Sequence, residues 1–185
     1  MANNYIQGTV DPFLPLKAWH FAVRDVFWET SGSIPEGLDF TDGKLTIVDE
    51  VQFREILSTE LGDEGDLKKL LEGLERLFAC GDEIFNLTWE RTSAAEDTTY
   101  YLYAEDGLGE ADLVFLQWVI EDMPPEIKWI TAEFAYSCSK MRPGEFGGGA
   151  WFITRDGTET FFTGSWLEQQ KRELEERTGV VHVRP

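Results

Sequence analysis

Two Asp-Gly dipeptides, Asp42-Gly43 and Asp156-Gly157, restrict the fold more than any other local feature of the chain. Each lies between short segments in which apolar and polar residues alternate. Glycine accepts the positive φ that a two-residue hairpin turn requires. Each dipeptide therefore predicts an antiparallel hairpin.

Three other segments have the composition of β-strands. Residues 85–89 and 98–103 are rich in aromatic and β-branched side chains, and they predict antiparallel strands on either side of an acidic loop. Apolar residues alternate with polar ones along 130–138, which predicts a strand in the centre of the sheet.

Helices are expected between these strands. The strongest signal is the i, i+3, i+4, i+7 spacing of leucines and Phe78 that follows Asp66 and stops at Gly81. Residues 110–121 favour a buried helix, although the run 113–116 also fits a strand. Further helices are expected over 49–61 and 165–179, each opened by a capping-box pattern, and within 16–28.

The elements are mixed without a β-α-β rhythm, which predicts an α+β fold. We expect one compact domain, residues 1–185, in which an antiparallel sheet built from hairpins packs against three to four helices. The content of 42% hydrophobic and 14% aromatic residues is too apolar for a disordered acidic chain.

The charge excludes several kinds of partner. The chain has 35 acidic and 16 basic residues, so its formal net charge is −19. Such a chain repels nucleic acid and anionic membranes. The sequence shows neither a signal-peptide pattern nor an apolar run of transmembrane length, and we expect a cytoplasmic protein.

The acidic residues are concentrated in the acidic hairpin and helix region, residues 82–126. This region has twelve acids and one base, Arg91, whereas residues 127–185 have eight of each. Concentrated like charge destabilises a fold by self-repulsion, so a functional benefit is expected. One such benefit is imitation of nucleic acid, which would let the chain occupy the Lys/Arg track of a nucleic-acid-binding protein.

This hypothesis assigns roles to particular residues. The expected acidic contact surface comprises Glu90, Glu96, Asp97, Glu105, Asp106, Glu110, Asp112, Glu121 and Asp122. Aromatic burial holds a complex that charge has steered together, and the candidate anchors are Trp89, Tyr101 and Tyr103. The glycine-rich segment is expected to be a flexible connection and a possible contact loop, with Lys140, Arg142, Gly147, Gly148 and Gly149.

The sequence thus favours a non-enzymatic inhibitor of the kind that phages and mobile elements direct against restriction or CRISPR systems. This similarity is one of size and charge, without a shared motif. Two alternatives stay open: an acidic accessory or binding protein of another role, and a hydrolase that uses paired carboxylates.

Other chemistry has little support in the sequence. Clustered Cys and His ligands are absent, so no metal site or cofactor is expected. A hydrolase triad needs a histidine beside a nucleophile, and the chain has only His20 and His182. Because His20 lies in an apolar segment, we expect a partly buried histidine that makes one hydrogen bond.

Overall fold

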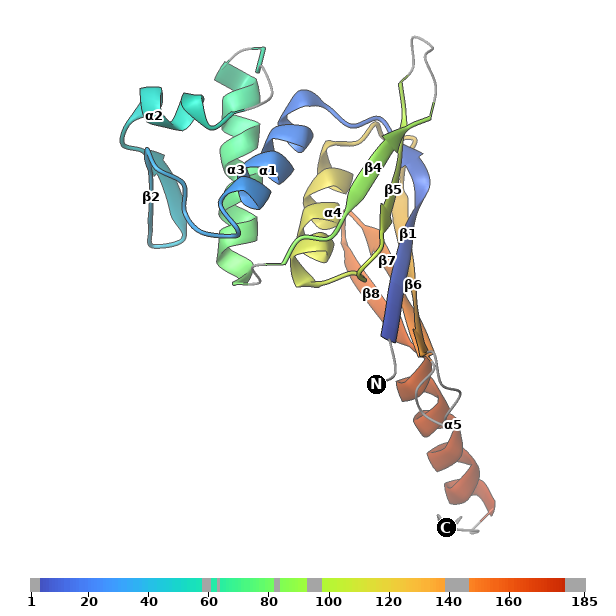
Figure 1. Ribbon diagram of the computed structural model, residues 1–185. Helices are drawn as coiled ribbons and strands as arrows, with labels where there is room; N and C mark the ends of the chain where they lie inside the picture. The colour runs from blue at the N-terminus through green and yellow to red at the C-terminus, as the bar shows by residue number, and fades with distance from the viewer. Residues whose placement is uncertain are drawn as a thin grey trace.

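The computed structural model describes residues 4–57, 61–62, 64–81, 84–92, 98–138 and 147–178. These residues form a six-stranded antiparallel sheet, a separate two-stranded hairpin and five helices (Figure 1). The predicted α+β class is confirmed, with slightly more helices than expected.

The six-stranded sheet has the order β4-β5-β1-β6-β7-β8, and every neighbouring pair is antiparallel. The strands are, in chain order, β1 Asn4–Leu14, β4 Thr88–Arg91, β5 Tyr100–Ala104, β6 Trp129–Cys138, β7 Gly147–Thr154 and β8 Gly157–Phe162. The hairpin predicted from Asp156-Gly157 joins β7 to β8, but its turn residues are Arg155 and Asp156, and Gly157, with a φ of 151°, is the first residue of β8. The hairpin of β4 and β5 matches the pair expected from residues 85–103, with its first strand shifted toward the C-terminus.

Of the two central strands, β6 matches the central strand predicted over 130–138, whereas β1 was not expected from the sequence. Strand β1 pairs with β5 on one side and β6 on the other, and Val10 lies opposite both Leu102 and Ala132. The alternation of apolar and polar residues along β1 is interrupted at Gly8, where an apolar side chain would have indicated a strand. A Cβ at this position would come within 2.8 Å of Leu108 Cγ.

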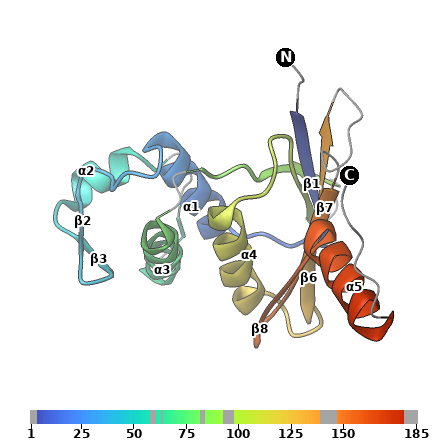
Figure 2. The same ribbon diagram turned by 90° about the horizontal axis from the view of Figure 1, so that it is seen from below.

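Four of the five helices lie in layers on one side of the sheet, and the last helix lies on the other side (Figure 2). The helices are α1 Ala18–Glu29, α2 Glu50–Glu55, α3 Glu64–Cys80, α4 Glu110–Asp122 and α5 Thr163–Thr178. Next to the sheet is α4, followed by α1 and α3. The hairpin of β2 Leu38–Thr41 and β3 Lys44–Ile47 lies with α2 at the far end. Asp42-Gly43 forms its predicted turn, and both residues have positive φ.

Helix α4 is buried on most of its circumference because it lies between the sheet and α3. Its buried side chains include Phe115, Leu116, Trp118, Val119 and Ile120. A helix covered on several sides does not need a polar stripe. This explains why residues 113–116 could be read as either a strand or a helix.

Gly73 in α3 lies where three helices pack closely against one another. A Cβ added there would lie 2.7 Å from Val23 Cγ2 of α1 and 2.9 Å from the Trp118 ring of α4. Glycine in a helix ordinarily costs about 1 kcal/mol relative to alanine. Overpacking a core typically costs about 1–3 kcal/mol. At Gly73 we expect this cost to exceed the stability gained by replacing a helical glycine with alanine.

We therefore expect Gly73→Ala to lower the midpoint of urea denaturation, although most exposed helical Gly-to-Ala changes raise it. Replacing the exposed Ser165 of α5 with alanine provides a control of small effect on the same scale. A higher midpoint for Gly73→Ala would contradict the close packing of α1, α3 and α4.

The last helix differs from the others because it does not cover the sheet. It follows β8 and projects beyond the ends of the strands (Figure 1), and none of its described side chains is buried. Within the described part of the chain, no helix combines the length and apolarity needed to cross a bilayer.

Candidate functional site: the open face of the sheet

The face of the sheet opposite α4 has no helical layer over most of its area (Figure 2). We call it the open face. Strand pairing and alternation define its described residues, which are Gln7, Thr9, Asp11, Phe13, Thr88, Glu90, Tyr101, Tyr103, Trp129, Thr131, Glu133, Ala135, Gly148, Ala150, Phe152, Thr154, Glu159 and Phe161.

Large aromatic side chains are exposed on this face. Phe13, Trp129, Phe152 and Phe161 have between 41% and 53% of their surface accessible to water. The rings of Trp129 and Phe152 stack across neighbouring strands with centroids 6.3 Å apart. Monomeric proteins rarely expose contiguous apolar patches of this kind without a binding partner.

The charges of the open face have one sign. Its carboxylates are Asp11, Glu90, Glu133 and Glu159, and none of the residues that define it is a Lys, Arg or His. Although residues 127–185 are neutral overall, the carboxylates that they contribute to this face are Glu133 and Glu159, without a base.

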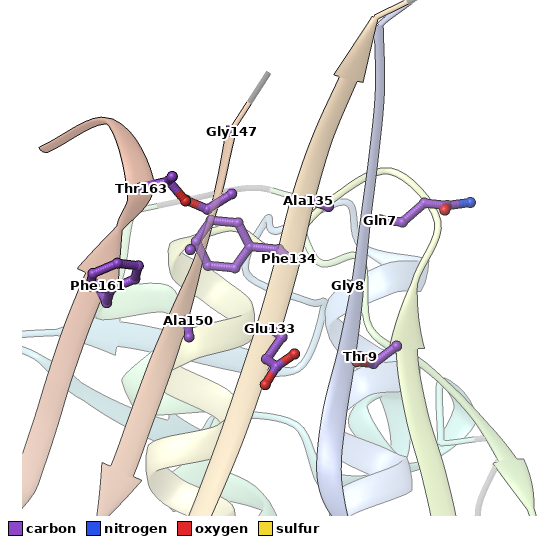
Figure 3. A pocket seen from close by; sticks show the side chains of 12 residues that line it. Gln7, Gly8, Thr9, Glu133, Phe134, Ala135, Gly147, Ala150, Phe161 and Thr163 are labelled. Carbon is purple, nitrogen blue, oxygen red and sulfur yellow. The ribbon is translucent and has the colours of Figure 1, made fainter. Parts of the chain in front are cut away.

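Two hollows lie side by side on the open face and share Gln7, Gly8 and Thr9 of β1. The smaller, of about 410 Å³, lies over β1 and β5 and is lined also by Glu90, Tyr101, Tyr103 and Glu105. The larger, of about 670 Å³, lies over β1, β6, β7 and β8 (Figure 3). Of the twelve residues that line the larger hollow, Glu133 alone is charged.

The smaller hollow brings together four residues that the sequence had assigned to the contact surface. The rings of Tyr101 and Tyr103 stack with centroids 5.6 Å apart, and the Tyr103 hydroxyl donates a 3.3 Å hydrogen bond to Glu90 Oε1. Partial removal from water raises the pKa of Tyr103, and the nearby charges of Glu90 and Glu105 raise it further.

Two acids predicted for the contact surface are engaged elsewhere in the fold. Glu121 accepts two hydrogen bonds from Arg76, at 2.8 and 2.7 Å, and this contact lowers the pKa of the Glu121 carboxyl. Asp122 accepts a hydrogen bond from Trp19 Nε1 at 2.9 Å, and its other oxygen lies 3.3 Å from Lys69 Nζ. The bases of α3 therefore offset these charges.

Asp112 requires a correction, because it is fully buried and does not belong to the contact surface. Its carboxylate accepts hydrogen bonds from three backbone N–H groups, those of Asn86 and Leu87 at 2.9 Å and that of Gly109 at 2.8 Å. Position 112 is the third residue of α4, where an acidic side chain caps the helix and satisfies otherwise unpaired donors.

Trp89 also requires a correction, because it faces the helices and not the open face. Its neighbour Leu102 on β5 points to the core, so strand alternation turns Trp89 inward and Glu90 outward. The Arg24 guanidinium carbon lies 3.8 Å from the centroid of the Trp89 ring, and Phe21 meets the same ring edge-on at 5.3 Å. Trp89 is therefore a partly buried packing residue.

The glycine-rich segment is partly strand. Gly147, Gly148 and Gly149 pair with β6 at the start of β7, so their assignment to a flexible loop is wrong. A Cβ on Gly148 would lie 2.4 Å from the Phe134 carbonyl oxygen, and one on Gly149 would lie 2.4 Å from that of Phe161. These glycines permit a close approach of three backbones.

The remaining predicted residues are placed as follows. Glu105, Asp106 and Glu110 are exposed between β5 and the first turn of α4. Glu96, Asp97, Lys140 and Arg142 lie outside the described residues. The described residues contain no group of three or more Cys, His, Asp or Glu side chains arranged to hold a metal ion.

Sequence reasoning did not select Asp11, Glu133, Glu159 or the exposed phenylalanines. The sequence did indicate the orientation of Glu133, because this residue alternates with the apolar residues of its strand and so lies on the opposite face. Its proximity to β1, however, depends on pairing between distant segments.

Comparisons of the chain with protein-family models, with curated proteins and with solved structures gave no match.

Proposed function

We propose that the chain is a non-enzymatic binding protein of the cytoplasm that uses its open face to cover a basic surface on a nucleic-acid-binding protein. The observation that carries this proposal is the combination, on one uncovered face, of exposed aromatic rings and carboxylates without any described basic side chain. By occupying a site for nucleic acid, the chain would act as an inhibitor.

The aromatic rings support a protein partner. Aromatic residues such as Phe, Tyr and Trp are enriched in protein interfaces, where burial of the rings contributes most of the holding energy. Trp129, Phe152 and Phe161 are large enough to serve as such anchors, and Tyr101 and Tyr103 extend the aromatic surface to β5.

The carboxylates support a basic partner. They lie on β4, β1, β6 and β8, and strand spacing spreads the two outermost strands over roughly 24 Å. Duplex DNA presents several phosphates over such a distance, and proteins that bind it carry matching lysines and arginines. A surface of this charge also steers association with a basic protein.

Neutralising the carboxylates of the open face is expected to weaken binding of this partner. The face variant combines Glu90→Gln, Glu133→Gln and Glu159→Gln, and the control variant combines Glu29→Gln, Glu36→Gln and Glu50→Gln at exposed positions outside the open face. Each protein is immobilised and exposed to cell lysate at low salt, with and without duplex DNA. The DNA affinity of any recovered protein is then measured with each variant added.

We expect the wild-type and control proteins to recover a basic nucleic-acid-binding protein, to be displaced by DNA, and to weaken the partner's binding to DNA. The face variant should bind that partner at least tenfold more weakly, with a shallower dependence on salt. Equal binding by the face variant, or a partner indifferent to DNA, would contradict mimicry and favour an accessory role.

A further inference from the structure

The larger hollow on the open face owes its shape to small side chains. Ala135, Gly148 and Ala150 occupy neighbouring outward positions on β6 and β7, and Gly148 cannot carry a Cβ beside the Phe134 carbonyl. Side chains at the edge of this floor rise above it. The result is a depression between Thr9 and Glu133 on one side and Phe161 on the other (Figure 3).

Strand register places three of these residues in a single row. Glu133 of β6 is directly opposite Ala150 of β7, and Ala150 is directly opposite Phe161 of β8. The row therefore has a carboxylate at one end, a methyl group in the middle and an aromatic ring at the other end. The end residues are two strand spacings apart, roughly 10 Å between backbones.

The carboxylate in this row is available for a ligand. Glu133 is exposed, and its side chain makes no hydrogen bond or ion pair with another residue in the described part of the chain. The nearest polar residues that line the hollow are Gln7 and Thr9 of β1, which are uncharged. Among the described residues that line the hollow, no base offsets the charge of Glu133.

We propose that this hollow receives an arginine side chain of the basic partner, a step that rests on the proposed function and specifies its chemistry. The guanidinium would pair with the Glu133 carboxylate, while its flat face and alkyl chain would lie over Ala150 and against the Phe161 ring. The volume of about 670 Å³ also accommodates the partner's backbone on either side of the arginine.

Arginine fits this row better than lysine does. Its planar guanidinium forms two parallel hydrogen bonds with a carboxylate and stacks on aromatic rings, whereas the lysine ammonium is a compact and strongly hydrated charge. A site with a carboxylate, a flat floor and an aromatic ring allows arginine to make the paired hydrogen bonds and the stacking contact at the same time. Charge alone would not distinguish the two residues.

The test uses octa-arginine and octa-lysine peptides, whose binding to the purified chain is measured by isothermal titration calorimetry. Two variants alter the hollow at exposed positions: Glu133→Gln removes its charge, and Ala135→Leu fills its floor. Glu159→Gln removes one charge from the same face outside the hollow and serves as the matched control. Thermal denaturation confirms that each variant is folded.

We expect wild type to bind octa-arginine several-fold more tightly than octa-lysine. Glu133→Gln and Ala135→Leu should each raise the Kd for octa-arginine about tenfold, and Glu159→Gln should change it less than threefold. Equal effects of Glu133→Gln and Glu159→Gln, an unchanged Kd in Ala135→Leu, or equal affinity for both peptides would overturn the proposal.

The two proposals can fail separately. If the face variant loses its partner while octa-arginine shows no dependence on the hollow, the binding function stands without an arginine site. If octa-arginine depends on Glu133 and Ala135 but no partner is displaced by DNA, the arginine site stands and nucleic-acid mimicry fails.

Discussion

Replacing Asp112 with alanine is expected to lower the free energy of unfolding by about 3 kcal/mol or more, enough to unfold a marginal domain. The buried carboxylate accepts hydrogen bonds from the backbone N–H groups of Asn86, Leu87 and Gly109. Alanine would leave the N–H of Leu87, which lies in a buried contact, without this acceptor. Urea denaturation measures the change.

Two further variants distinguish the hydrogen bonds from the volume of the side chain. Asp112→Asn keeps one carbonyl acceptor for Asn86 and Leu87 but presents an amide donor to the Gly109 N–H, so an intermediate loss is expected. Glu110→Gln, at an exposed position in the same first turn of α4, should change stability by less than about 0.5 kcal/mol. A loss for Asp112→Ala as small as that for Glu110→Gln would contradict the structural role.

The burial of Asp112 affects how the acidic surface is tested. Asp112 adds to the excess of acids in residues 82–126, yet its charge is used inside the fold. A charge-reversed Asp112 would abolish any binding activity by unfolding the protein. Substitutions that probe the open face must therefore be confined to exposed residues such as Glu90, Glu133 and Glu159.

His20 is expected to make stability depend steeply on pH below about 6.5. Its imidazole is fully buried, and burial, with Lys17 and Lys69 nearby, lowers the pKa of His20 from 6.5 to about 3. Its Nδ1 accepts a hydrogen bond from the Lys17 N–H at 2.9 Å; the sequence predicted one hydrogen bond for this histidine, but only partial burial. Its Nε2 lies 3.7 Å from Asp122 Oδ2 and has no hydrogen-bond partner in the described structure.

The direction of the effect follows from proton binding. Above pH 6.5 the imidazole is neutral in both the folded and the unfolded protein, so it contributes no pH dependence. Between about 6.5 and 3 the unfolded chain binds a proton that the folded chain does not. Each unit of acidification in this window removes up to about 1.4 kcal/mol of stability.

The matched variant for this prediction is His20→Gln. Glutamine at the third position of α1 can still accept the Lys17 N–H, as in a capping box, but does not titrate. Urea denaturation of both proteins at pH 7.5, 6.0 and 5.0 measures the difference between them, in which the carboxylates common to both cancel. The stability of wild type should fall relative to the variant as pH decreases, and parallel curves would show that His20 is not buried as a neutral group.

The elements that could be predicted from the sequence are those specified by neighbouring residues. The two hairpins depend on the conformational freedom of Gly43 and Gly157, which have positive φ, and α3 depends on leucine spacing within seventeen residues. Such signals are contained within one turn or helix. They were sufficient to identify the α+β class and the hairpins.

The candidate site was harder to predict because strand pairing assembles it from distant parts of the chain. Glu90, Asp11, Glu133 and Glu159 share a face only because β1 inserts between β5 and β6, which follow it by about ninety residues or more. The excess of acid in residues 82–126 suggested one contiguous surface. Asp112 is instead buried, while Glu121 and Asp122 contact the bases of α3.

The sequence by itself determined the local elements and the overall charge, because turn geometry, helical periodicity and ionisation depend on residue type and near neighbours. Only the tertiary structure decided which carboxylates remain unpaired and which aromatic rings remain exposed. Those properties depend on which strands become neighbours and which face the helices cover, and both are set by contacts between residues far apart in the chain.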